Sequence, residues 1–189
     1  TVQCVPAFAL SAREQPEPLD DVLSGFAERS AREDHHEFYW FPHTDRALTK
    51  TNSRVDIARA APRPRMKAWI DDVVIGNGLH QIACTAGRMI PAAVPAINRL
   101  SAHVWGERTF TDVSHRVFTT QRSVRFREME YALPAERLNQ AFARIRAAID
   151  DNGWRVEFPL EVRSAAADEV WGPTLESAGF QIIFSTPGI

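Results

Sequence analysis

Hydrophobic and polar residues alternate most strictly in the segment Arg155–Arg163, RVEFPLEVR. Successive side chains of a strand point to opposite faces, so this pattern predicts a strand whose buried face carries Leu160 and Val162. The opposite face carries Glu161 and Arg163, about 7 Å apart along the strand. A carboxylate and a guanidinium held in this way can grip a polyhydroxylated ligand, but an ion pair on a solvated strand face gives the same pattern.

Weaker patterns of the same kind predict further strands, at residues 1–12, 35–42, 48–57, 115–119 and 123–133. The two prolines of Gln15–Pro18 predict a turn after the first of these strands. Apolar residues recur at helical spacing from Leu19 onward and again after Pro134. The segment 66–104, rich in Ala, Ile and Val, is predicted to be helical with interruptions at its glycines and prolines.

Two strand–helix–strand units, residues 1–42 and 123–163, therefore bracket a helical middle segment. They share a pattern of elements but no sequence similarity, so they do not form a sequence repeat. This order of elements predicts an α+β fold, in which helices cover a largely antiparallel sheet.

Composition excludes several classes of protein. The formal net charge of −2 argues against a nucleic-acid-binding protein. Cys4 and Cys84 are the only cysteines, too few for a disulfide scaffold and without the spacing of a zinc site. No secretory signal is visible, and no apolar run reaches the roughly 20 residues that a membrane-spanning helix needs. We expect a cytoplasmic location and leave open a peripheral attachment to the membrane.

Other chemically active side chains give weaker signals. His35, His36 and His43 lack the spacing of a metal site, so no metal is predicted. The aromatic strand that contains Trp40 either ends at a ligand or belongs to the core, and Glu128 lies in a strand with a second carboxylate. We count Trp40 and Glu128, together with the Glu-x-Arg pair, as candidate substrate contacts.

Three segments in this order, HHEFYWFPHTDRALTKTNSRV, FREMEYALP and EVRSAAADEVW, give the chain a family resemblance. It resembles the C-terminal substrate domain of the aldonolactone oxidoreductases over roughly residues 1–171. This group contains the D-arabinono-1,4-lactone oxidases and the L-gulono-1,4-lactone oxidases and dehydrogenases, with the related alditol oxidases. They are flavoproteins of the vanillyl-alcohol-oxidase class.

The resemblance implies that the chain is a cap domain, whose sheet covers an FAD held mainly by a separate N-terminal domain. In the alditol oxidase branch a Glu-x-Arg strand touches substrate hydroxyls, and here that motif is Glu161-Val162-Arg163. The implied reaction oxidises a secondary alcohol of a D-arabinono- or L-gulono-1,4-lactone. Arg163 would donate to a substrate oxygen and Glu161 would accept from a hydroxyl, which makes both candidate catalytic residues. Whether Glu161 is also the base stays open.

The resemblance ends at Trp171, because residues 172–189 match neither the family's Ser-Pro-x-Tyr-Gly-Arg-type segment nor its His-Trp-Gly-Lys motif. This loss suggests a frameshifted or truncated reading frame. We therefore expect a partial substrate domain over residues 1–171 and a divergent tail. Such a chain lacks the flavin domain, is inactive alone and needs a flavin domain supplied in trans. The alternatives are a non-catalytic module that binds sugar acids or a protein, and a decayed gene fragment.

Overall fold

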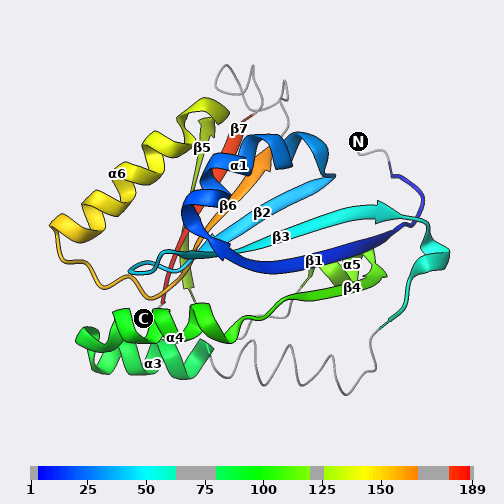
Figure 1. Cartoon of the computed structure of the whole chain (residues 1–189). Coiled ribbons are helices and arrows are strands. Elements are labelled where there is room, and N and C mark those ends of the chain that lie inside the picture. The colour runs from blue at the N-terminus through cyan, green and yellow to red at the C-terminus, as the bar shows by residue number, and fades with distance from the viewer. Residues whose placement is uncertain (1–3, 63–79, 120–125, 166–178, 188–189) are drawn as a thin grey trace.

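The computed structural model describes residues 4–62, 80–119, 126–165 and 179–187, which build one antiparallel sheet with helices (Figure 1). The strand order is β4-β1-β3-β2-β6-β7-β5. The strands are β1 (Ala9–Pro18), β2 (His35–Trp40), β3 (Arg46–Val55), β4 (Arg108–Val113), β5 (Phe126–Pro134), β6 (Leu160–Ala165) and β7 (Gly179–Pro187). The α-helices are α1 (Leu19–Arg32), α3 (His80–Met89), α4 (Val94–Val104), α5 (Ser114–Phe118) and α6 (Leu138–Asp151). Short 3₁₀ turns are η1 (Ile57–Arg59), η3 (Pro91–Ala93) and η4 (Ala135–Arg137). The predicted α+β class is confirmed.

The two predicted strand–helix–strand units have the same topology. In the first unit β1, α1 and β2 are followed by β3, which inserts between β1 and β2. In the second unit β5, α6 and β6 are followed by β7, which inserts between β5 and β6. The inserted strand is antiparallel to both of its neighbours, so the two outer strands of each unit run parallel to each other. The units meet where β2 pairs with β6.

Helices α1 and α6 cover the same face of the sheet, and the main hydrophobic core lies between them and the strands (Figure 1). On this face Phe38, Val162 and Phe142 are fully buried. The ring of Phe142, from α6, packs edge-on against Trp40 with 5.0 Å between centroids. Aromatic pairs of this geometry add about 0.5–1.5 kcal/mol to the stabilisation that comes from buried area.

Both predicted helices are confirmed, and their ends follow elementary rules. Asp20 and Asp21 lie in the first turn of α1, where carboxylates interact favourably with the helix dipole. The chain leaves α6 through Gly153, whose φ of 62° is a conformation that glycine adopts at little cost.

The turn predicted at Gln15–Pro18 is wrong, because β1 continues through Pro18. Strand β4 pairs with β1 only from Ala9 to Glu14, so the last residues of β1 have β3 as their one neighbour in the sheet. A proline has no backbone N–H with which to pair with a second strand. The last residues of β1 need no such donor on the side away from β3, so proline is tolerated there.

The strand predicted at residues 115–119 is also wrong, because Ser114–Phe118 form the short helix α5. Val117 is buried against Leu10 and Ala12 of β1, and a helix of five residues is too short to show a helical periodicity in the sequence. The strand of this region is β4, immediately before it. Helices α3 and α4 confirm the helical prediction for residues 80–104, whereas residues 66–79 lie outside the described part.

Helix α4 is tied to both units by one buried side chain. The Asn98 amide, 1% exposed, donates hydrogen bonds of 2.9 Å to the carbonyl oxygens of Pro42 and Val156. These carbonyls follow β2 and precede β6, so α4 fixes the end of the seam between the units. None of the helices in the described residues combines the length and hydrophobicity needed to cross a membrane.

The last described segment, residues 179–187, contributes the strand that completes the second unit. Residues 179–187 form β7, which pairs with β5 on one side and with β6 on the other. Phe180 and Ile182 are each 1% exposed and belong to the main core. Residues 166–178, which include the start of the tail, lie outside the described part.

Candidate functional site

Glu161 and Arg163 lie on the sheet face opposite α1 and α6, and they contact each other. The distance between Arg163 Nη2 and Glu161 Oε1 is 2.7 Å. Leu160 and Val162, between which Glu161 lies, point to the other face and are buried under the helices. This alternation in β6 fixes the two charged side chains on one face without backbone strain.

Strands β2 and β3 place further polar groups beside this pair. Tyr39 is the register partner of Glu161, and Glu37 is the register partner of Arg163. The Tyr39 hydroxyl donates to Glu37 Oε1 at 3.3 Å, and Lys50 Nζ of β3 lies 3.2 Å from the same oxygen. We call these five residues the polar cluster. Paired residues of antiparallel strands share a face, so the cluster forms a row of alternating charge across three strands.

Burial differs within the pair, which matters for its chemistry. The side chain of Glu161 is only 11% exposed, whereas that of Arg163 is 43% exposed. Burial by itself would lower the pKa of Arg163, but the carboxylates of Glu161, Glu37 and Glu130 raise it above its ordinary value. The guanidinium is therefore a permanent cation, and its exposed portion can donate hydrogen bonds to a ligand.

Trp40 does not lie in the polar cluster. It is 2% exposed, packs against Phe142 on the helix-covered face and donates from Nε1 to the carbonyl oxygen of Thr44 at 2.9 Å. It shares this face with Phe38, because the two residues are two positions apart in the strand. The structure thus places Trp40 in the core, where it anchors the turn after β2, and we do not include it among the proposed substrate contacts.

Glu128 lies on the same face as the polar cluster but near the edge of the sheet. Its register partner in β7 is Ser185, and the neighbouring Glu130 pairs with Ile183, which in turn pairs with Glu161. Glu128 is exposed, and β7 separates its strand from β6. Strands lie about 4.8 Å apart, so Glu128 is about 10 Å or more from Glu161 and can meet only the far end of a ligand held there.

The histidines of the HHEFYWFPH segment occupy separate environments. His35 packs edge-on against Phe118, and His36 Nδ1 lies 3.0 Å from the Thr51 hydroxyl. Burial lowers the pKa of His35 and of His36, so both are mainly neutral at pH 7. Within the described residues no three His, Cys, Asp or Glu side chains converge in a way that could hold a metal ion.

Glu37, Tyr39 and Lys50 are not among the site residues predicted from the sequence. The first two alternate with the buried residues of β2, a signal that was available from the sequence. Their position beside Glu161 and Arg163 depends on the pairing of β2 with β6, more than 120 residues later in the chain. No local pattern contains that register.

Comparison with known sequences gives consistent results. The family model described as D-arabinono-1,4-lactone oxidase matches residues 1–179. An L-gulono-1,4-lactone dehydrogenase of Mycobacterium tuberculosis is 37% identical over 169 residues, which are 89% of this chain and 39% of that protein. An L-gulonolactone oxidase of Scyliorhinus torazame is 28% identical over 173 residues, 90% of this chain and 38% of that protein. The chain thus spans about two fifths of the length of these relatives.

Among solved structures, the chain is similar to a solvent-stable cholesterol oxidase. The TM-score is 0.64 at 15% sequence identity, and the match covers 96% of this chain and 43% of that one. A cholesterol oxidase from Brevibacterium sterolicum, in a His-to-Ala mutant, gives a TM-score of 0.53 at 15% identity, with 97% of this chain and 42% of that one covered. At this identity the similarity supports the fold alone.

Proposed function

Because the chain belongs to the D-arabinono-1,4-lactone oxidase family, we propose that it is the substrate-binding part of an FAD-dependent oxidoreductase that acts on a sugar 1,4-lactone. The observation that carries this proposal is the Glu161–Arg163 pair, joined at 2.7 Å on the face that α1 and α6 leave uncovered. A sugar lactone presents ring and carbonyl oxygens together with several hydroxyls. It therefore needs donors and acceptors side by side, which this pair offers.

In this proposal Arg163 donates hydrogen bonds to a lactone oxygen, and Glu161 accepts one from the hydroxyl of the carbon that is oxidised. The contact between Glu161 and Arg163 fixes the orientation of the Glu161 carboxylate, so the substrate hydroxyl binds to it in one position. D-Arabinono- and L-gulono-1,4-lactone, each oxidised at a secondary alcohol, are the proposed substrates. The remaining cluster residues, Glu37, Tyr39 and Lys50, hold the pair from the β2 side.

The polar cluster fits the substrate side of a flavin site rather than the part that binds the dinucleotide. The described residues supply no hydrogen-bond partner to the buried Arg163 Nε, and the side chain keeps an exposed portion, so this guanidinium has donors to offer a ligand. FAD, when bound, supplies the hydride acceptor for oxidation of an alcohol. The residues that hold FAD are proposed to lie mainly in a flavin domain outside this chain, in keeping with the 39% of the relative that the chain covers.

Titration of the purified chain with L-gulono-1,4-lactone and D-arabinono-1,4-lactone tests the binding role. We expect saturable binding of at least one lactone, and at least a tenfold loss of affinity in Glu161→Gln and in Arg163→Ala. Arg13→Ala is the matched control, because Arg13 is a strand arginine that contacts Glu107 at 3.7 Å. The proposal fails if neither lactone binds the wild type, or if the control loses as much affinity as Arg163→Ala.

Co-expression with a candidate flavin domain tests the catalytic part. An absorbance spectrum of the purified complex reports bound flavin, and bleaching on lactone addition reports its reduction. Bleaching by wild type but not by Arg163→Ala supports an oxidoreductase that is assembled from two parts. Lactone binding without bleaching would instead support a sugar-binding module without catalysis.

A further inference from the structure

A second group of polar side chains surrounds a cleft at the end of β2, away from the polar cluster. The cleft has a volume of about 400 Å³, and its basic lining residues are Arg46, Arg99, Arg146, His43 and His103. They come from the turn between β2 and β3 and the first residue of β3, from α4 and from α6. Three segments that are far apart in the sequence thus direct basic side chains to one place.

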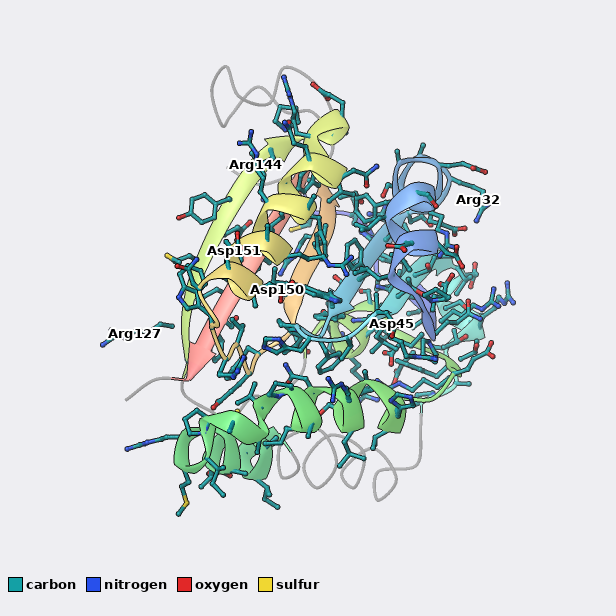
Figure 2. All side chains as sticks on the ribbon, turned by 60° about the vertical axis from the view of Figure 1, so that its left-hand side comes forward. Arg32, Asp45, Arg127, Arg144, Asp150 and Asp151 are labelled. Atoms are coloured by element: carbon teal, nitrogen blue, oxygen red, sulfur yellow. The ribbon has the colours of Figure 1, made fainter. Side chains whose placement is uncertain are left out.

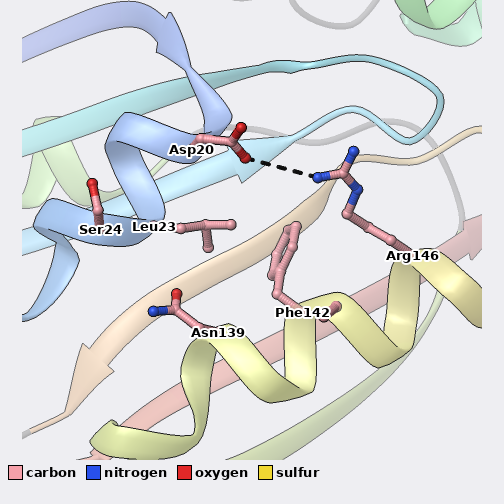
Figure 3. A pocket seen from close by; sticks show the side chains of 7 residues that line it. Asp20, Leu23, Ser24, Asn139, Phe142 and Arg146 are labelled. Atoms are coloured by element: carbon pink, nitrogen blue, oxygen red, sulfur yellow. Dashed lines mark ion pairs between the residues drawn. The ribbon is translucent and has the colours of Figure 1, made fainter.

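The charge of this cleft contrasts with that of the whole chain. Asp45 is the one carboxylate among the lining residues, so three arginines leave a formal charge of +2 with both histidines neutral. The complete chain has a formal charge of −2. Arg146 also approaches Asp20 at the start of α1, but the distance is 3.9 Å and both side chains are well exposed (Figure 3). Such an exposed pair is weak, so Arg146 is available to a ligand.

Two residues that line the cleft each carry a buried nitrogen atom for which the described residues supply no hydrogen-bond partner, His43 Nε2 and Arg46 Nε. Burying a polar atom without a partner is unfavourable, and such atoms are rare in folded proteins. Burial lowers the pKa of His43, and the nearby Arg155 and Arg99 add to this effect, whereas Asp150 and a hydrogen bond with the Trp154 backbone oppose it. It is therefore the arginines that favour an anion: their cationic guanidinium groups converge on the cleft, and an anion would supply the acceptor that the buried Arg46 Nε lacks among the described residues.

The turn that carries these groups is held rigidly. The Thr44 hydroxyl donates to the carbonyl oxygen of Phe41 at 2.7 Å, and its own carbonyl accepts from the buried indole of Trp40 at 2.9 Å. His43 adopts a φ of 68°, which is uncommon for a residue other than glycine. The core therefore fixes the position of His43 and of Arg46 before any ligand arrives, which limits the entropy lost on binding.

From this geometry we infer that the cleft binds a small oxyanion, of the phosphate or carboxylate class, between the β2–β3 turn and helices α4 and α6. Guanidinium groups match the oxygens of phosphate and carboxylate in pairs of parallel hydrogen bonds. The volume exceeds what a bare phosphate needs, so the natural ligand carries a small polar body beside its anionic group. This site does not depend on the proposed lactone chemistry, because α6 lies on the opposite face of the sheet from Glu161.

Calorimetric titration of the complete chain with inorganic phosphate, sulfate and D-gluconate, each at constant ionic strength kept with sodium chloride, tests the inference. We expect one saturable site for at least one of the three anions. Arg99→Gln and Arg46→Gln should each weaken it at least tenfold, with far-UV circular dichroism used to verify folding. Arg99 is exposed, so its replacement should leave the fold intact. Stronger binding of phosphate or of gluconate identifies which of the two anion classes is preferred.

Arg144→Gln is the matched control, because Arg144 is an exposed arginine of α6 that does not line the cleft (Figure 2). It should change the affinity less than twofold. The inference is overturned if none of the three anions binds more tightly than chloride. It is also overturned if Arg144→Gln weakens binding as much as Arg99→Gln, because the effect would then be one of general charge.

Discussion

Glu17, the penultimate residue of β1, combines partial burial with several hydrogen bonds. Both terminal nitrogens of Arg29 donate to its carboxylate at 2.8 Å, and the Thr49 hydroxyl donates at 2.6 Å. Burial would raise the pKa of Glu17, but the hydrogen bonds from Arg29 and Thr49 outweigh it and leave the pKa below its ordinary value of 4.5. These contacts tie the last turn of α1, which contains Arg29, to strands β1 and β3.

We predict that Glu17→Gln makes stability less dependent on acid pH. A carboxyl whose pKa is lower in the folded state stabilises the protein above its unfolded pKa, and this contribution is lost as the pH falls through the folded value. Urea unfolding at pH 7 should show a loss of about 1.5–3 kcal/mol in the variant, the range for a hydrogen bond to a charged group. Between pH 5 and pH 3 the wild type should then lose more stability than the variant.

Glu107→Gln serves as the control for this experiment, because Glu107 is an exposed partner of Arg13 at 3.7 Å. Glu107→Gln should change the free energy of unfolding at pH 7 by about 0–1 kcal/mol. If wild type and Glu17→Gln lost the same amount of stability between pH 5 and pH 3, the contact with Arg29 would not be lowering the pKa of Glu17.

At the level of single residues, the sequence determines which side chains share a face but not what lies next to them. Strand alternation predicted that Glu161 and Arg163 point the same way, and their register with β2 agrees. The same rule, applied to HHEFYW, places Trp40 on the same face of the strand as Phe38 and on the opposite face from Glu37. Trp40 could therefore have been assigned to the core from its position alone, whereas the contact of Glu37 with Lys50 depends on pairing that no local pattern contains.

Among the residues of helix α6, Phe142 has the largest fully buried side chain. Its ring packs against Trp40 and against Phe38, with centroid distances of 5.0 and 5.9 Å. We predict that Phe142→Ala destabilises the protein by about 3–5 kcal/mol, the range for truncating a buried aromatic residue. The measurement is the free energy of unfolding in urea.

Arg144→Ala, two residues further along the same helix, keeps helix propensity equal or better and removes only an exposed side chain. It should change stability by less than about 0.5 kcal/mol. A similar loss of unfolding free energy in Phe142→Ala and Arg144→Ala would mean that any substitution in this helix destabilises the protein, and that the aromatic contact is not the cause.

At the level of elements, the predictions succeeded where a local pattern decides the structure. The two long helices α1 and α6 each bury one apolar face, and their periodicity was visible. The errors at Gln15–Pro18 and at residues 115–119 have tertiary causes. The first segment is a strand because β3 runs beside it, and the second is a helix because Val117 packs on β1. Neither neighbour can be identified from the segment itself.

At the level of the whole molecule, the two units share one core. Residues of α1, β2, α6, β6 and β7 belong to a single buried cluster, so neither unit encloses its apolar surface alone. Phe180 of β7 is 1% exposed within this cluster and comes from the last described strand. The similarity of topology between the units does not make them independent domains, since a domain needs a core of its own.

We therefore predict that a lesion in the second unit destabilises the first. Phe180→Ala should lower the protection of α1 amides against hydrogen exchange by about 3–5 kcal/mol, as much as it lowers that of α6, because both helices open in the same cooperative event. Gln181→Ala, at the next position of β7 and on the opposite face, should have little effect on either helix. If α1 kept its protection while α6 lost it, the two units would unfold separately, and the shared cluster would not be what couples them.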